Sequence, residues 1–280
     1  MNALVVGCGY LGHCVVRKAP ADWNWYALTR SAHRGEELRA AGIRPLVGNW
    51  LNRAELGGPW PDFDALLIAV PHRPDPELGD ATHVVGLGHV LDNLPSLPQR
   101  IVYISTTGVY ANSGGTFDEQ TEPAPQRPGG RIALAAERWL QDHLPATGLI
   151  LRSAGIYGPG RLPMLDRMRR NEPLPVAPQA MLNLIHVEDL ARAAVELLRE
   201  RPPHSLYVAA DGHPVARGEF YRYMAQRLGL AEPRFEPPAG GGRRGTGGKR
   251  VCPSRLLRDL DFQFLYPSYR SGIDALCDQL

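Results

Sequence analysis

The segment Gly7-Cys8-Gly9-Tyr10-Leu11-Gly12 constrains the fold most, because it lies between a short apolar run and a stretch with a helical pattern. The run from Ala3 to Val6 ends at a glycine, as a buried parallel strand does. In such a strand–turn–helix, the glycines allow a tight turn, a close approach of phosphate and close helix packing. The free N–H groups of the helix start also attract anions. The pattern predicts a dinucleotide-binding turn; a glycine-rich turn without ligand is the alternative.

Strand and helix patterns alternate from residue 2 to about residue 210. Strands are predicted at 3–7, 25–29, 43–47, 65–70, 100–105, 148–152 and 205–209, and helices at 10–19, 33–41, 80–94, 131–143 and 187–200. Regular alternation of this kind favours an α/β fold in which a doubly wound parallel sheet, the Rossmann fold, carries helices on both faces.

The alternation ends after residue 210. We expect a helix at 217–229, a glycine-rich mobile loop at 237–250 and two short helices within 253–280. The chain is therefore predicted to have a dinucleotide-binding domain at 1–160 and 184–210, and a small substrate-binding lobe at 161–183 and 211–280.

Composition excludes several classes of protein. No apolar run approaches the roughly 18 residues that cross a bilayer, and the start of the chain lacks the pattern of a signal peptide. A net charge of +2 is too small to indicate nucleic acid as a partner, and the four cysteines form no metal-ligand pair. We expect a cytoplasmic protein that binds a small-molecule substrate and no metal, with a homodimer left open.

The residue that selects the cofactor in such folds follows the second strand, where an Asp or Glu accepts from the ribose 2′-hydroxyl of NAD. Here Arg30 and Ser31 occupy that place, with Arg34 close by. A guanidinium cannot accept a hydrogen bond but suits a 2′-phosphate. The sequence favours NADP(H) over NAD(H); the alternative is that Arg30 stacks on the adenine.

Three further segments complete a pattern with the glycine turn. They are Tyr-Ile-Ser-Thr-Thr-Gly-Val-Tyr at 103–110, Leu-Arg-Ser-Ala-Gly-Ile-Tyr-Gly-Pro-Gly at 151–160 and Asn-Leu-Ile-His-Val-Glu-Asp-Leu-Ala at 183–191. With these four segments in order, the chain resembles the atypical and extended short-chain dehydrogenase/reductases, the NAD-dependent epimerase/dehydratase family, and within it the YeeZ-like group. The likeness covers nearly the whole chain.

The resemblance implies roles for several residues. Thr106 matches a Ser/Thr that hydrogen-bonds the substrate carbonyl, and 155–159 resembles the loop that holds the nicotinamide carboxamide. Asn49 matches a position near the adenine. The expected cofactor-binding residues are Gly7, Gly9, Tyr10, Leu11, Gly12, Arg30, Ser31, Asn49, Ala69, Val70, Ser105 and Ile156. His186 and Asp189 are expected to cap and pack rather than react.

The family's usual catalytic pair, Tyr-x-x-x-Lys, is missing. Aligning on Ala135-Ala136-Glu137 puts the tyrosine at Gly129 and the lysine at Ala133, and the only lysines are Lys18 and Lys249. In the family the lysine lowers the pKa of the tyrosine, so that the phenol exchanges a proton near neutral pH. The standard mechanism is therefore in doubt, while the cofactor turn is intact.

Other residues could replace the pair. Tyr110 and Tyr157 stand at predicted carboxyl ends of strands, where the pocket of such a sheet opens. Arg131, at the start of the helix that normally carries the pair, could supply positive charge to an oxyanion. Each has a simpler interpretation, because a tyrosine there often only packs its ring and such an arginine is often only solvated. Lys249 and Arg250 could likewise belong to a lid or to a solvated linker.

Three functions remain open at this point. The first is an NADP(H)-dependent oxidoreductase that acts on a carbonyl, imine or activated alkene with a non-standard acid. The second is a catalytically silent protein that binds or senses NADP(H). The third, a sugar-nucleotide epimerase or dehydratase, is weakened by the missing pair and by Gly155, where such enzymes often carry an asparagine. We favour the enzyme of the first hypothesis.

Overall fold

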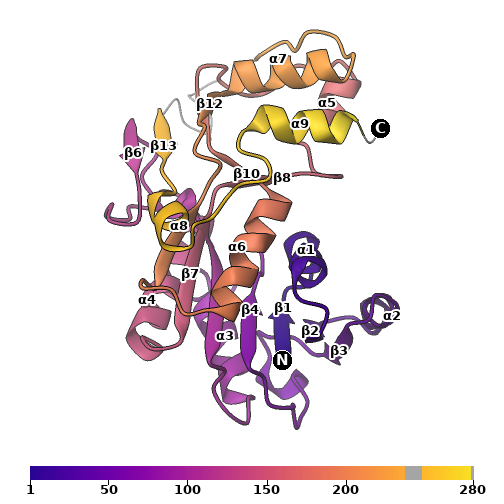
Figure 1. Ribbon diagram of the computed structural model, residues 1–280, viewed down its shortest axis with the longest axis vertical. Helices are drawn as coiled ribbons and strands as arrows, with labels where there is room; N and C mark the ends of the chain where they lie inside the picture. The colour runs from indigo at the N-terminus through magenta and orange to yellow at the C-terminus, as the bar shows by residue number, and fades with distance from the viewer. Residues whose placement is uncertain (237–247, 279–280) are drawn as a thin grey trace. The chain divides into compact units, whose positions relative to one another are not determined.

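The computed structural model describes residues 1–236 and 248–278. The central sheet has seven strands in the order β11-β7-β5-β4-β1-β2-β3. Figure 1 shows the sheet with α1 and α6 beside it. These strands are β1 (Asn2–Val6), β2 (Asn24–Thr29), β3 (Arg44–Val47), β4 (Ala65–Ile68), β5 (Arg100–Thr106), β7 (Gly148–Ser153) and β11 (Leu206–Ala209). The pairs β1–β2, β1–β4, β2–β3 and β4–β5 are all parallel. The predicted doubly wound α/β fold is confirmed.

The predicted helices are present. The helices are α1 (Tyr10–Lys18), α2 (Ala32–Ala40), α3 (Thr82–Asp92), α4 (Pro128–His143), α5 (Leu165–Arg169), α6 (Val187–Arg199), α7 (Arg217–Arg227), α8 (Ser254–Asp259) and α9 (Tyr269–Cys277), with 3-10 turns η1 (Arg53–Glu55) and η2 (Thr107–Val109). The helix α4 begins three residues before the predicted start, because Pro128 at its first turn has a fixed φ and needs no hydrogen-bond partner there.

Short strands that the sequence pattern does not reveal complete the fold. They are β6 (Gly115–Phe117), β8 (Gly155–Tyr157), β9 (Met181–Leu182), β10 (Leu184–His186), β12 (Val215–Ala216) and β13 (Lys249–Val251). The prediction of a loop over 237–250 was wrong at its end, since Lys249 and Arg250 pair with Gly115 and Thr116 of β6. Residues 237–247 of that loop lie outside the described part of the chain.

The chain divides into two compact units. Unit 1 comprises 1–110, 123–152 and 191–207; unit 2 comprises 111–122, 153–190 and 208–280. Each has its own apolar core, the first around Leu66, Ile68 and Tyr103 and the second around Phe220 and Tyr157. These units assign 111–122, 153–160, 184–190 and 208–210 differently from the predicted domain bounds, and a substrate-binding role for the second unit stays a prediction.

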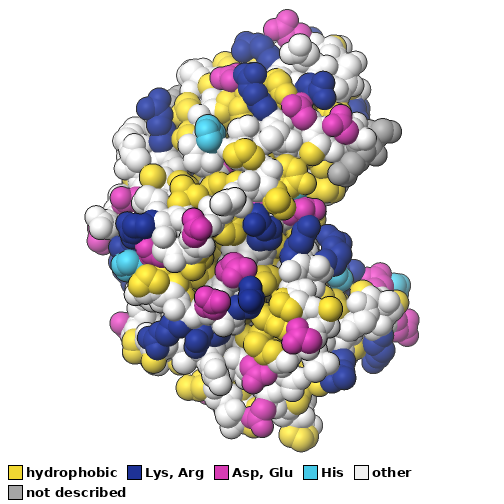
Figure 2. Space-filling view, viewed as in Figure 1, with side chains coloured by type: hydrophobic (Ala, Val, Ile, Leu, Met, Phe, Trp, Pro, Cys, Tyr) yellow, Lys and Arg dark blue, Asp and Glu magenta, His cyan; other side chains and the backbone are white. Residues whose placement is uncertain are grey.

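On the face shown in Figure 2, basic and acidic side chains are interspersed. Among the residues that the structure describes, no helix is long and apolar enough to span a bilayer, and no group of three potential metal ligands occurs.

Candidate functional site

The glycine turn of unit 1 has the geometry that its sequence predicts. Gly7 has φ +92°, and a Cβ there would stand 2.7 Å from the carbonyl carbon and oxygen of Ala69. A Cβ on Gly12 would stand 2.9 Å from the Gly7 carbonyl oxygen. Both glycines are thus required by packing, and the first of them holds the turn against the end of β4, where Ala69 and Val70 were expected to meet the cofactor.

Gly9 differs from the other two glycines because it faces open space. It is exposed, and no atom lies within 4 Å of the position that its Cβ would take. It is the N-cap of α1, whose first turn contains no acidic residue. The turn therefore offers backbone N–H groups and the positive end of a helix to an anion, with room for it to approach.

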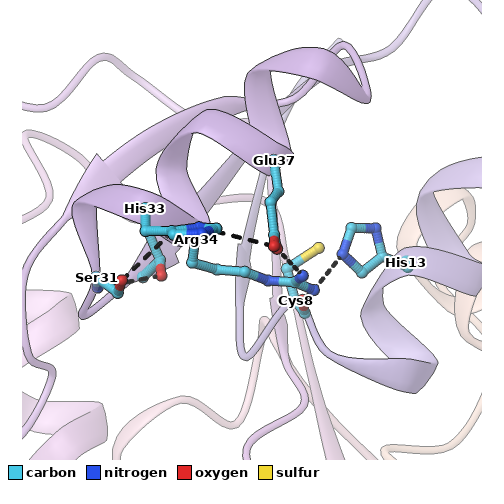
Figure 3. A network of polar contacts seen from close by, with 7 residues as sticks. Cys8, His13, Ser31, His33, Arg34 and Glu37 are labelled. Atoms are coloured by element: carbon cyan, nitrogen blue, oxygen red, sulfur yellow. Dashed lines mark hydrogen bonds and ion pairs between the residues drawn. The ribbon is translucent and has the colours of Figure 1, made fainter.

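Arg34 links the second helix to this turn, as Figure 3 shows. Its Nη2 donates to the carbonyl of Cys8 at 3.3 Å and lies 2.7 Å from Nε2 of His13 in α1. Its Nη1 forms an ion pair with Glu37. Burial, and next the charge of Arg34, lower the pKa of His13, so the neutral ring accepts the hydrogen bond. Burial also raises the pKa of the Cys8 thiol to about 11, against the opposing effect of Arg34, which excludes a thiolate here.

The expected cofactor-selecting residues stand at the start of α2. Ser31 is the N-cap, and its hydroxyl accepts from the backbone N–H of Arg34 at 3.3 Å. Arg30 is exposed. No acidic residue occurs in the first turn of α2. Arg30 after β2 and Arg34 in the first turn of α2 therefore bring two guanidinium groups to this region, with Glu37 one turn further along the helix as the partner of Arg34.

The remaining predicted cofactor residues fall into different surroundings. The Asn49 side chain accepts from the backbone N–H of Leu51 and shapes the loop after β3. Ser105 is buried and donates its hydroxyl to Glu137, so only its backbone remains for a ligand. Leu11 is buried in α1 and Tyr10 is half-buried. Ile156 lies in β8 of unit 2, paired with Ile185.

The four proposed catalytic residues have unequal access to a ligand. Thr106 is half-buried at the end of β5, where its hydroxyl accepts from the backbone N–H of Gly108 at 3.0 Å. Arg131 is exposed and donates from Nε to Asp80 at 2.7 Å. Tyr110 and Tyr157 are both buried. Of these four residues, Thr106 and Arg131 thus have accessible polar groups.

Tyr110 belongs to a buried charged cluster. The guanidinium of Arg152 donates to the Tyr110 hydroxyl at 3.0 Å from Nη1 and to the Glu137 carboxylate at 2.6 Å from Nη2. The same guanidinium carbon lies 4.9 Å from the centre of the Tyr110 ring. This contact orients the phenol toward a fixed cation inside the protein, which is a packing role rather than that of an exposed acid.

Tyr157 is engaged within unit 2. Its hydroxyl donates to the Ser268 carbonyl at 3.3 Å, and a Cβ on Gly272 would stand 2.1 Å from that hydroxyl. Burial, and next the carboxylates of Asp211 and Asp189, raise its pKa well above the ordinary value. The phenol is therefore a weaker acid than a free tyrosine. Asp189 accepts from two backbone N–H groups, those of Leu265 and Tyr266 in the loop before α9, so it makes buried hydrogen bonds to that loop.

The structure also contains a polar cluster that the sequence did not reveal. His72, from the loop after β4, places Nε2 3.1 Å from the hydroxyl of Tyr103 in β5. His83, from α3, places Nδ1 2.9 Å from the same hydroxyl and Nε2 3.2 Å from the Pro71 carbonyl. His83 and Tyr103 are fully buried, whereas His72 is partly exposed. These residues come from three separate elements, and no local motif joins them.

The chain matches a known family over most of its length. Residues 3–210 match the NAD dependent epimerase/dehydratase family. The chain is 36% identical over 210 residues to Protein YeeZ of Escherichia coli K12, and this match covers 74% of the present chain and 73% of Protein YeeZ. It is 25% identical over 313 residues to the 3-diazoavenalumate denitrifying reductase of a Streptomyces species, covering 98% and 99% of the two chains.

A solved structure extends the likeness to the whole chain. The UDP-glucuronic acid 4-epimerase of Bacillus cereus, in complex with NAD, has a TM-score of 0.77 and 16% identity, and the match covers 99% of this chain and 98% of that one. At this identity the likeness concerns the fold alone.

Proposed function

Because the chain belongs to the NAD-dependent epimerase/dehydratase family, we propose that it is an NADP(H)-dependent oxidoreductase that acts on a carbonyl, imine or activated alkene of a small molecule. The observation that carries the proposal is the turn around Gly9, which is open to an anion while Gly7 and Gly12 are closely packed. A reductase among the full-length relatives supports the reaction class. The missing Tyr-x-x-x-Lys pair disfavours an epimerase or dehydratase that uses it.

The residues of unit 1 fit a dinucleotide. Backbone N–H groups at Gly9 to Gly12 would hold the pyrophosphate at the start of α1. Arg30 and Arg34 would hold a 2′-phosphate at the start of α2, because a guanidinium donates two parallel hydrogen bonds to phosphate oxygens. The bound nicotinamide would supply or accept a hydride. Thr106, with its hydroxyl at the end of β5, would orient the reacting group, and Arg131 would favour negative charge on it.

Glu37 bears on the choice between the two cofactors. In the protein as described, this carboxylate neutralises Arg34. A 2′-phosphate carries more charge than a carboxylate and has three acceptor oxygens, so it would displace Glu37 from the guanidinium. A 2′-hydroxyl could not. The proposal for NADP(H) therefore depends on Arg30 as the exposed partner and Arg34 as the exchangeable one.

The test compares NADPH and NADH binding, followed by nicotinamide fluorescence, in Arg30→Asp and in Arg39→Asp. Arg39 is exposed at the other end of the same helix and serves as the control. Loss of one or two charge-assisted hydrogen bonds should weaken NADPH binding of Arg30→Asp about 10- to 100-fold, with NADH binding within about threefold of the wild type. Equal losses for the two cofactors would contradict the NADP(H) assignment.

Turnover separates an enzyme from a silent NADP(H)-binding protein. Oxidation of NADPH is followed with a panel of ketones, imines and enones. At least one of these classes should give turnover in the wild type that exceeds the rate without substrate. Tight NADPH binding with no turnover on any class would favour the silent protein instead.

A further inference from the structure

Two nitrogens of the Arg34 guanidinium face different neighbours, as Figure 3 shows. Nη1 forms the ion pair with Glu37, one turn along α2. Nη2 donates to the Cys8 carbonyl at 3.3 Å and lies 2.7 Å from Nε2 of His13, so the contact with His13 is the shorter of the two. Nη2 therefore holds the guanidinium across to the glycine turn and α1, and Nη1 is the nitrogen that a ligand could take from Glu37.

His13 reaches Arg34 because of its position in α1. It directly follows Gly12, and its backbone N–H donates to the Gly9 carbonyl at 2.9 Å, which places it one turn after the N-cap of the helix. Its side chain is half-buried, and the ring meets Arg34 of the neighbouring helix. The turn that offers N–H groups to a pyrophosphate thus also fixes the position of the acceptor for Arg34.

The contact with Arg34 defines the state of the His13 ring. A guanidinium can only donate, so Nε2 of His13 accepts and the ring carries its proton on Nδ1. Burial, and next the charges of Arg34 and Arg17, lower the pKa of His13, while the charge of Glu37 opposes the shift. A protonated ring would offer no lone pair to Arg34 and would repel it. His13 is therefore a neutral acceptor at neutral pH.

The Arg34 guanidinium lies between two segments that a dinucleotide would contact. In a fold of this kind the pyrophosphate lies at the glycine turn, and the residues after the second strand contact the 2′ position of the adenosine ribose. Nη2 of Arg34 contacts the turn at Cys8, while the backbone N–H of Arg34 donates to Ser31, the cap of α2. The guanidinium thus spans the region that the adenosine half of the cofactor would occupy.

We propose that His13 is a positioning residue for cofactor preference, which holds Arg34 against the glycine turn so that Nη1 can bind a 2′-phosphate in place of Glu37. The proposal rests on the NADP(H) binding proposed above. Without His13, Arg34 keeps Glu37 and the 3.3 Å contact with Cys8, so its side chain can follow Glu37 along α2. Fixing a long side chain in its bound conformation lowers the entropic cost of binding. His13 should therefore favour cofactors that carry a 2′-phosphate and leave the binding of a 2′-hydroxyl unchanged.

The experiment compares three variants of the full chain. His13→Leu removes the acceptor, whereas His13→Gln restores one, because the amide oxygen of glutamine can take the place of Nε2. His33→Leu is the control, since His33 is exposed on α2 with its Nδ1 3.7 Å from the Glu37 carboxylate. Binding of NADPH and NADH is followed by nicotinamide fluorescence. Binding of adenosine 2′,5′-bisphosphate and of 5′-AMP, which lack the nicotinamide, is followed by calorimetry.

The expected losses are confined to ligands with a 2′-phosphate. In His13→Leu, NADPH and adenosine 2′,5′-bisphosphate should bind about 5- to 30-fold more weakly, with NADH and 5′-AMP within about twofold of the wild type. His13→Gln should recover most of this loss, and His33→Leu should show none. Nitrogen NMR of labelled histidines gives a readout without ligand, in which His13 should be the Nδ1-protonated tautomer with a pKa below the ordinary value.

The outcomes separate this proposal from the one before it. Equal losses of NADPH and NADH binding in His13→Leu, or no loss of either, would refute the role of His13, and so would a His13→Gln variant that binds NADPH as weakly as His13→Leu. If Arg30→Asp still distinguishes the two cofactors in that case, the NADP(H) assignment stands. A wild type that binds NADPH no more tightly than NADH would overturn both proposals.

Discussion

Breaking the buried ion pair of unit 1 should unfold this protein more readily than any loss of a surface charge. The side chains of Arg152 and Glu137 are 4% and 1% exposed, and Nε and Nη2 of the arginine donate to the carboxylate at 2.6 to 3.1 Å. Arg152→Met leaves Glu137 with the Ser105 hydroxyl as its remaining hydrogen-bond donor among those described. Removing one partner of a buried pair costs about 3 to 5 kcal/mol of unfolding free energy.

Two further variants make the estimate specific. Tyr110→Phe removes the acceptor of Nη1, which should cost about 1 to 3 kcal/mol because a buried donor is left unsatisfied. The double variant Arg152→Met/Glu137→Leu removes both charges, so it should be at least about 2 kcal/mol more stable than Arg152→Met alone. The exposed pair Arg131–Asp80, with side chains 45% and 46% exposed, is the control, and Arg131→Met should cost less than about 1 kcal/mol.

Urea denaturation followed by circular dichroism measures these differences. NADPH turnover of Tyr110→Phe is measured in parallel, and we expect it to remain within about threefold of the wild type, because the phenol is held by Arg152 rather than offered to a ligand. The reasoning fails if Arg152→Met costs no more than Arg131→Met, or if the double variant is no more stable than the single one. A turnover loss in Tyr110→Phe that exceeds its loss of stability would restore Tyr110 as a catalytic candidate.

Two other predictions concern the glycine turn and a buried carboxyl. Gly9→Val should weaken NADPH binding more than about tenfold with little change in melting temperature, because the valine side chain fills the open space over the turn. Gly12→Val should instead lower the melting temperature, because its side chain meets the Gly7 carbonyl. Equal effects of the two variants on stability would argue against the turn as a binding site. Burial raises the pKa of Asp211 to about 7, although the His213 backbone N–H opposes the shift. In the native state the Asp211 carboxyl therefore keeps its proton up to about pH 7, whereas in the unfolded state it releases the proton near pH 4. The contribution of Asp211 to the free energy of unfolding is complete below pH 4 and is lost as the pH rises toward 7. Between pH 4 and pH 8, the wild type should therefore lose about 2 to 4 kcal/mol more unfolding free energy than Asp211→Asn does. An identical pH dependence of urea denaturation in both proteins would refute this.

The sequence by itself was sufficient for the sheet and for the turn. The strands of the central sheet are short and mostly apolar runs, so all seven could be placed from residues that are close neighbours in the chain. The left-handed backbone of Gly7 and the close contact between Gly12 and the Gly7 carbonyl could also be predicted, because both are properties of the local backbone. The packing of Gly7 against Ala69 depends on the pairing of β1 with β4. The start of α2, with Arg30 and its Ser31 cap, follows from the same local rules.

The tertiary structure decided which side chains meet. Tyr110 and Tyr157 look alike in sequence, as tyrosines after strands, but each hydroxyl is engaged inside its own unit by a residue far along the chain. His72, His83 and Tyr103 carry no common motif, and they meet because β4 and β5 pair in the register that joins Ile68 to Tyr103. Backbone conformation depends on neighbours in sequence, whereas hydrogen bonding and pKa depend on neighbours in space. The polar cluster of His72, His83 and Tyr103 could therefore be found only in the folded chain.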